Sequence, residues 1–390
     1  MKIYQSTFFL QHSLSVNRVL LFTLVLLVVS CKEKFDSPLT PIATGYLVIE
    51  GVINNDGDTT KIKLSRTTNL SDNSRRFETG AIVKLEDNLN NSLFLVESGG
   101  EGNYIINNLH LDKSLTYRIN IKTISGDEYQ SDFVPVGNNP PIDSINWVQE
   151  DKGVQLYINT HDPQNNTRYY QWEFQETWEF HTLYSDLKYV PLSDPSDLNV
   201  VRRDVSDPQI FKCWKFDASS LILLGSSAKL QQDIIHLPLT LIPVDNERLS
   251  VLYSILVKQY SWSKEGYEFL ERMKKNTESV GSVFDAQPSE LNSNVHCTTN
   301  PSQPVVGFFN ICSIQKKRLF IDRKYLLHWD FRLPCRQVVV INDPDSIRVA
   351  GGLPTIAKQA MFGIISFYAS DPSCVDCRLT GTNVKPGYWP

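Results

Sequence analysis

The feature that most constrains this chain is a series of short segments in which hydrophobic and polar residues alternate, separated by turn residues. The clearest is residues 170–180, where every second residue is aromatic except Glu176 and polar residues occupy the positions between. Alternation with period two places the two sets on opposite faces of a β-strand. Aromatic residues, which favour such half-buried pleated surfaces, make up 11% of the chain. The fold class predicted is therefore mainly β.

Residues 45–138 contain about seven such segments, spaced roughly 8–15 residues apart, with no helical stretch. Many short strands at this spacing are typical of a small β-sandwich, so we expect an immunoglobulin-like or prealbumin-like sandwich over this range. Pro140 and Pro141 follow, and two consecutive prolines cannot continue a strand ladder. We therefore place a boundary here and expect a second, larger β-rich domain over residues 139–390.

One prominent helix is predicted in the second region, near residues 263–276. Ser263 is a suitable N-cap and Glu265 follows in the first turn. Tyr267, Leu270 and Met273 recur at helical spacing and form one apolar side.

The N-terminus has the organisation of an export signal. Basic Lys2 and Arg18 precede an apolar run over residues 19–29, which Ser30 and Cys31 follow. The run is too short to cross a bilayer, which requires about 20 apolar residues. Its end resembles a bacterial lipobox, so residues 1–30 are predicted to be a lipoprotein signal peptide, Cys31 the lipid attachment point and residues 31–44 a tether. Lys32 after the cysteine resembles lipoproteins of the outer membrane, and the leaflet is left open.

The cysteines and the net charge limit which kinds of covalent link, metal site and binding partner the protein can have. With Cys31 used for lipid attachment, six cysteines remain, an even number that suggests disulfides in an exported chain; they are Cys213, Cys297, Cys312, Cys335, Cys374 and Cys377. Joining Cys297 to Cys312 would stabilise the fold by about 3 kcal/mol in the chain-entropy model. A redox pair at Cys374 and Cys377, or a zinc site with Cys335, Cys297 or His296, are weaker alternatives. The net charge of −5 disfavours nucleic acid as a partner.

No catalytic residue, metal ligand or cofactor site is predicted. The chain has no His-Glu-x-x-His, no Gly-x-Ser-x-Gly and no phosphate-binding glycine motif. The aromatic strand over residues 170–180 offers one candidate ligand face, because aromatic side chains can stack on sugar rings. The residues of this face are Tyr170, Trp172, Phe174, Glu176 and Trp178. The same pattern more often forms a hydrophobic core, and a carboxylate such as Glu176 more often pairs with an arginine.

Several sequence blocks, in the same order as in a known family, carry a resemblance to it. They are YLVIEG (46–51), PPIDSI (140–145), KQYSWSKEGYEFL (258–270), GSVFDAQP (281–288), VGFF (306–309), KRLFI (317–321), the two cysteines of 374–377 and the terminal YWP. Over essentially the whole mature chain, the sequence resembles the DUF4249 proteins, lipoproteins of Bacteroidota with no assigned function. The resemblance implies an association with TonB-dependent outer-membrane receptors, beside which the family is typically encoded, and supplies no catalytic residues.

The function predicted from these observations is a non-enzymatic accessory role. We expect an outer-membrane lipoprotein that partners a TonB-dependent receptor by capturing substrate or docking onto the receptor. The alternative is a free-standing surface lipoprotein that binds glycans or peptides through the aromatic strand. An enzyme would require a carboxylate or Ser/His cluster that the sequence does not reveal.

Overall fold

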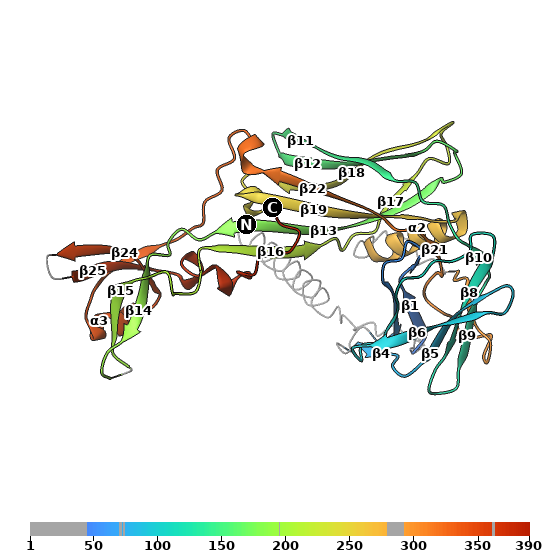
Figure 1. Ribbon diagram of the computed structural model, residues 1–390, viewed down its shortest axis with the longest axis horizontal. Helices are drawn as coiled ribbons and strands as arrows, with labels where there is room; N and C mark the ends of the chain where they lie inside the picture. Colours follow the sequence, from blue (N-terminus) through green and yellow to red (C-terminus); the bar gives the residue numbers. More distant parts are fainter. Residues whose placement is uncertain (1–44, 70–71, 73–74, 195, 279–291, 361–362) are drawn as a thin grey trace, which may run out of the picture. The chain divides into compact units, whose positions relative to one another are not determined.

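A computed structural model describes residues 45–69, 72, 75–194, 196–278, 292–360 and 363–390 (Figure 1). The predicted signal peptide, Cys31 and the tether lie outside the described residues. Strands dominate the chain, which confirms the mainly β fold class. Within the described ranges, no helix is both long and apolar enough to cross a membrane.

The first sheet curls around its own core. Its strands pair in the order β1 (Leu47–Glu50), β3 (Thr60–Arg66), β7 (Asn103–Ile106), β6 (Ser92–Ser98), β5 (Ile82–Asp87), β8 (Thr116–Lys122), β9 (Glu128–Ser131) and β20 (Val295–Cys297). Two short strands, β4 (Arg76–Phe77) and β10 (Val134–Pro135), pair with β3 and β8. Alternate residues such as Ile62, Leu64, Val83 and Leu85 point into the core. The last strand, β20, comes from a distant part of the chain.

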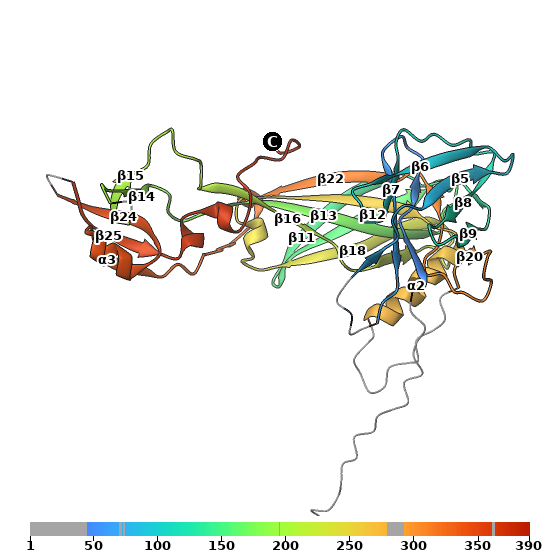
Figure 2. The same cartoon turned by 90° about the horizontal axis from the view of Figure 1, so that it is seen from below.

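Two further sheets face each other across the largest core cluster. One has the order β11 (Ile142–Glu150), β12 (Gly153–Asp162) and β18 (Asp233–Pro243). The other has the order β16 (Lys212–Ala218), β13 (Tyr169–His181), β19 (Leu252–Ser261) and β22 (Gln315–Asp322), with β17 (Leu223–Ser226) also paired with β13. Figure 2 shows β13 and β16 running side by side. We call this pair of sheets the central sandwich.

A third group of elements has a smaller core and is called the terminal sheet here. It comprises β23 (Gln337–Ile341), β25 (Gly363–Ser370) and β24 (Leu353–Ala360) in that order, with the hairpin β14 (Leu187–Pro191) and β15 (Leu198–Arg202) and helix α3 (Pro344–Ala350). Val340 and Phe367 from the sheet, Leu187 and Val200 from the hairpin, and Ile347 from α3 are buried together. Asp343 caps α3 by accepting a hydrogen bond from the backbone N–H of Ser346 (3.0 Å).

The predicted helix is α2 (Lys264–Glu278), and its cap is confirmed, because Oγ of Ser263 accepts a hydrogen bond from the N–H of Gly266 (3.1 Å). The remaining elements are short. They are β2 (Ile53–Asn54), which pairs in parallel with β21 (Ile311–Cys312), and four 3₁₀ turns, η1 (Glu247–Leu249), η2 (Arg323–Tyr325), η3 (Pro372–Cys374) and η4 (Cys377–Leu379).

Candidate functional site

The aromatic face of β13 is part of the hydrophobic core of the central sandwich, not a ligand face. Its five predicted site residues are no more than 9% exposed; they are Tyr170, Trp172, Phe174, Glu176 and Trp178. They pack with aliphatic residues of β11, β12 and β18. The indole Nε1 of Trp172 donates to Oε1 of Gln259 (2.9 Å), so even the polar atom of this side chain is satisfied inside the protein. The prediction of an accessible aromatic surface on β13 is therefore wrong, because the facing sheet covers it.

Glu176, the one carboxylate on that face, is held by a tyrosine and an arginine. The hydroxyl of Tyr253 donates to its Oε1 (2.7 Å), and Nη1 of Arg248 lies 3.5 Å from its Oε2. Burial raises the pKa of the Glu176 carboxyl despite these partners. Arg248 also binds Asp217 (2.6 Å) and lies over the ring of Trp178. Glu176 thus has the arginine-paired role that the sequence favoured over ligand binding.

The opposite face of β13 fastens the C-terminal segment to the central sandwich. Oε2 of Glu179 accepts from Nε1 of Trp389 (3.0 Å), and its Oε1 lies within 2.9 Å of His181 Nε2 and Lys212 Nζ. Burial by itself would raise the pKa of Glu179, but these hydrogen bonds outweigh it and lower the pKa to about 2.

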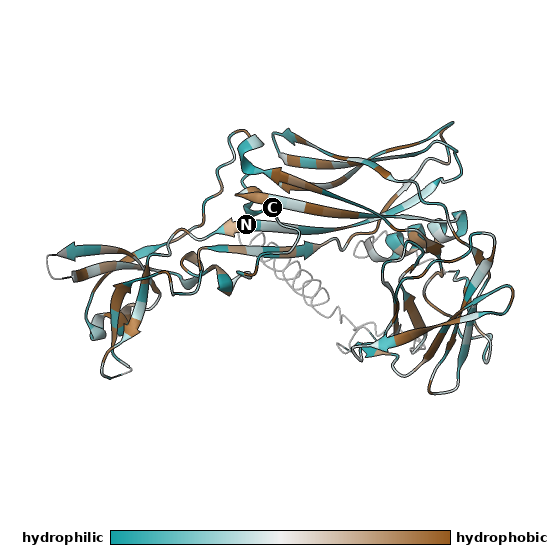
Figure 3. Cartoon of the chain, in the orientation of Figure 1, coloured by the Kyte–Doolittle hydropathy of each residue, from teal (hydrophilic) through white to brown (hydrophobic). Residues whose placement is uncertain are grey.

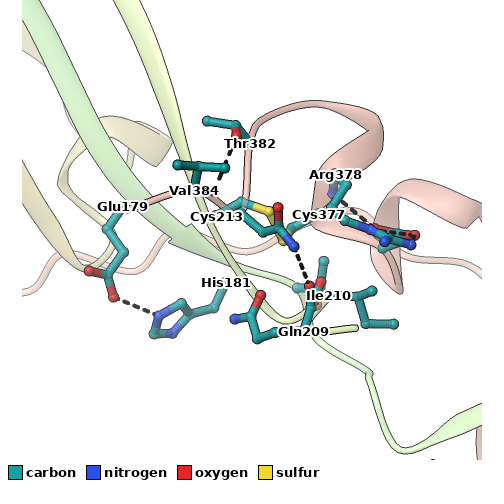
Figure 4. Close-up of a disulfide and its surroundings, with 12 residues drawn as sticks. Glu179, His181, Gln209, Ile210, Cys213, Cys377, Arg378, Thr382 and Val384 are labelled. Atoms are coloured by element: carbon teal, nitrogen blue, oxygen red, sulfur yellow. Dashed lines mark hydrogen bonds and ion pairs between the residues drawn. A yellow bond between two sulfur atoms is a disulfide. The ribbon is translucent and has the colours of Figure 1, made fainter. Parts of the chain in front are cut away.

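Four of the six predicted cysteines form two disulfides. Cys213 on β16 is joined to Cys377, and Cys335 is joined to Cys374. Figure 4 shows the first of these beside Glu179 and His181. Cys374 and Cys377 therefore belong to different disulfides, which excludes the redox-pair and zinc alternatives for these two residues. Disulfides are typical of chains that leave the reducing cytoplasm.

Cys297 and Cys312, which were included among the possible disulfide cysteines, are not joined: both are free, buried thiols. Cys297 ends β20, which pairs with β9, whereas Cys312 ends β21, which pairs with β2. The sulfur of Cys297 contacts Thr299 Oγ1 (3.3 Å). Burial raises the pKa of the Cys312 thiol to about 12, so at neutral pH it stays protonated and is a poor nucleophile.

An open groove runs between β23 and α3 at one edge of the terminal sheet. It has a volume of about 580 Å³, and eight residues line it; they are Val338, Val339, Val340, Ile341, Asp345, Ser346, Val349 and Ala350. Val339 and Ile341 are 60% and 62% exposed, and Val349 is more exposed still. Figure 3 shows how hydrophobic and hydrophilic residues are distributed along these elements. A cluster of exposed aliphatic side chains of this kind marks an interaction surface more often than chance exposure.

The backbone of β23 also offers unused hydrogen-bonding groups. Among the described residues, β23 pairs with β25 alone. The N–H of Asn342 donates to the carbonyl of Ile365 (3.1 Å), and in an antiparallel pair the inward-facing groups recur at every second residue. Val338 and Val340 are therefore bonded to β25, and both backbone groups of Val339 and the N–H of Ile341 face outward. The carbonyl of Ile341 accepts a hydrogen bond from the N–H of Asp343 (2.9 Å). An extended chain is the structure that satisfies such a row of groups.

The open edge of β23 was not predicted from the sequence. The sequence did contain a signal of this edge, since residues 338–341 are four consecutive aliphatic residues with no proline and no charged residue among them. Proteins usually protect an edge strand from further pairing with a proline or a charged side chain. Within the described ranges, no group of three or more His, Cys, Asp or Glu side chains is placed to hold a metal ion.

The comparison with protein families gives a match to a family of unknown function. The model of a family described as Domain of unknown function (DUF4249) matches residues 32–318, well over half of the chain. The match includes the first sheet, α2 and most of the central sandwich, and it ends before β23. No curated protein matches the chain.

Proposed function

From the premise that the chain belongs to the DUF4249 family, we propose that it is an exported, lipid-anchored accessory protein of a TonB-dependent outer-membrane receptor, with no catalytic role of its own. In this proposal Cys31 carries the lipid, and the folded part binds the receptor. Two disulfides in a chain that begins with a lipobox-type signal support export into an oxidising compartment. A lipid anchor with several acyl chains holds a protein stably at a membrane without a spanning helix.

The observation that carries the receptor-docking part is the open edge of β23. The occupant is an extended segment of the receptor that adds to β23 as a further strand, with its main chain bonded to Val339 and Ile341 and its alternate side chains in the groove. Asp345, the one charged side chain among the described residues that line the groove, is already paired with Arg348 (3.1 Å), so the aliphatic side chains of the groove are left to select the segment. An unprotected apolar edge strand promotes aggregation when nothing covers it. This favours a permanent complex in which the receptor segment covers β23.

Affinity purification from the native host tests the proposal. The full-length chain with a C-terminal tag is extracted in mild detergent, and retained proteins are identified by mass spectrometry. We expect a TonB-dependent receptor with the unaltered chain, and its loss with the double variant Val339→Lys/Ile341→Lys, because two buried lysines would oppose the added strand. Val205→Lys is the matched control, since Val205 is fully exposed in a turn away from the groove.

Three outcomes would each reject one part of the proposal. The receptor partnership fails if no such receptor is retained with the unaltered chain. The docking site fails if the double variant retains the receptor as well as Val205→Lys does. A Cys31→Ser variant that stays in the membrane fraction would reject the lipid anchor.

A further inference from the structure

The first sheet, the central sandwich and α2 together form a cleft of about 500 Å³. The residues that line it differ from those that line the β23 groove. The lining of the cleft comes from β1, β3, β13, β19, α2 and the segment after β20. Clefts of roughly 300–1,000 Å³ are the usual size for small-molecule sites.

One wall of the cleft is aromatic and aliphatic. The rings of Trp262 and Phe308 meet edge to face with centroids 6.3 Å apart, and Phe269 of α2 packs against Phe308 (5.7 Å). Met273 adds a flexible thioether to the same wall. Gly266 allows this packing, because a Cβ atom there would lie 2.7 Å from the ring of Trp262. The glycine therefore lets the rings of Trp262 and Phe308 lie close to the first turn of α2.

Three lysines line the cleft from two sheets. Lys61 and Lys63 stand two residues apart on β3 and therefore on the same face, and Lys258 lies on β19. Lys258 is half-buried, yet its ammonium group makes no hydrogen bond or ion pair with any residue that the structure describes. Nζ of Lys63 lies over the ring of Phe77 (4.7 Å) and likewise has no described anionic partner.

The two carboxylates of the cleft do not neutralise these lysines. Glu173 is directly opposite Lys258 in the β13–β19 pair, but its Oε2 instead accepts a hydrogen bond from the hydroxyl of Tyr260 (2.9 Å). Glu50 is opposite Lys63 in the β1–β3 pair and is exposed, with no ion pair among the described residues. Among the described residues that line the cleft, three positive charges against two negative ones leave an excess of one positive charge. A half-buried ammonium without a partner is costly, and an anionic ligand removes that cost.

We propose that this cleft binds a small organic anion with an apolar body. The apolar part packs against Trp262, Phe308 and Met273, and the anionic group is bound by Lys258 together with the lysines of β3. The cleft and the β23 groove share no residue, so the two proposals can fail separately.

A pair of fluorescent probes isolates the role of charge. The probes are 8-anilinonaphthalene-1-sulfonate and its uncharged counterpart N-phenyl-1-naphthylamine, titrated into the folded exported chain. We expect the sulfonate to bind more tightly than the neutral probe, and Lys258→Gln to weaken the sulfonate about tenfold while leaving the neutral probe unchanged. Lys258→Arg should restore most of the sulfonate affinity, because it keeps the charge.

Three controls keep the result interpretable. Lys229→Gln removes an exposed lysine elsewhere and should change neither affinity. The Val339→Lys/Ile341→Lys variant removes probe binding at the other apolar groove and sets the background. Met273→Trp, which fills the cleft, should weaken both probes. Equal affinity for the two probes, or a Lys258→Gln protein that binds the sulfonate as well as Lys229→Gln does, would overturn the inference.

Discussion

The central sandwich and the terminal sheet each contain a strand with aliphatic residues, but the two strands lie in opposite environments. Val257 on β19 has no exposed surface, whereas Val339 on β23 is 60% exposed. β19 is paired on both sides, by β13 and β22, and its side chains face a second sheet. β23 is paired on one side, and only Val340 reaches the small core beneath it. The comparison shows that an aliphatic strand stabilises the fold where neighbouring strands and a facing sheet cover it. Where it is paired on one side only, its aliphatic side chains are available to a partner.

The largest expected effect is on the core of the sandwich. Trp172→Ala should lower the free energy of unfolding by about 4 kcal/mol, because it leaves a cavity and an unpaired Gln259 amide oxygen. Phe94→Ala, at an exposed aromatic on β6, should change it by less than about 1 kcal/mol. Urea denaturation followed by circular dichroism measures both. Equal losses for the two variants would mean that the β13 aromatics are not core residues.

The next effect concerns the covalent link between β16 and the C-terminal segment. In the chain-entropy model, removing Cys213–Cys377 with paired serine substitutions should cost about 1 kcal/mol more than removing Cys335–Cys374. The first closes a loop with a sequence separation of 164 residues and the second one of 39, so the first restricts the unfolded chain more. Chemical denaturation of the two double variants compares them, and a larger loss from the shorter loop would contradict the loop-length explanation.

A smaller, pH-dependent effect should come from Glu179. Its folded pKa of about 2 lies below the ordinary value of 4.5, so its contribution to stability is complete above about pH 5 and is lost as the pH falls toward 2. The difference in unfolding free energy between the unaltered chain and Glu179→Gln should therefore shrink from about pH 6 to about pH 3. A difference that is constant over this range would show that the carboxylate is not held ionised by Lys212, His181 and Trp389.

The smallest effect is expected at the exposed edge. Val339→Lys should change the free energy of unfolding by no more than about 0.5 kcal/mol, because the side chain is already in water. Val257→Lys, the matched substitution in the sandwich, should prevent folding, because it buries an unpaired charge. Thermal unfolding of the two proteins separates them. Severe destabilisation by Val339→Lys would show that β23 is covered within the chain itself.

Local patterns were sufficient for much of the fold. The alternation over residues 170–180 predicted β13 and the composition of its two faces, and Ser263 predicted the start of α2. Helix α3 was missed because it has only seven residues, although Asp343 and Pro344 are a suitable N-cap and first helical residue.

Long-range pairing was not available from local patterns. The periodicity of a strand reports that one face is buried but not which segment covers it, so the aromatic face of β13 was open to a ligand interpretation. Nothing local to residues 295–297 indicates that they pair with β9, and this pairing is what holds Cys297 apart from Cys312. The edge position of β23 depends in the same way on which strands become neighbours, and so does the absence of an ion-pair partner for Lys258 among the described residues.

Amide hydrogen exchange at β23 tests the central claim most directly. In the isolated protein, the amides of Val339 and Ile341 should exchange faster than those of Val338 and Val340, because they face outward. In the detergent-extracted complex with the receptor, the amides of Val339 and Ile341 should become protected by the added strand. Protection of all four amides before the receptor binds, or no change at Val339 and Ile341 afterwards, would contradict the account.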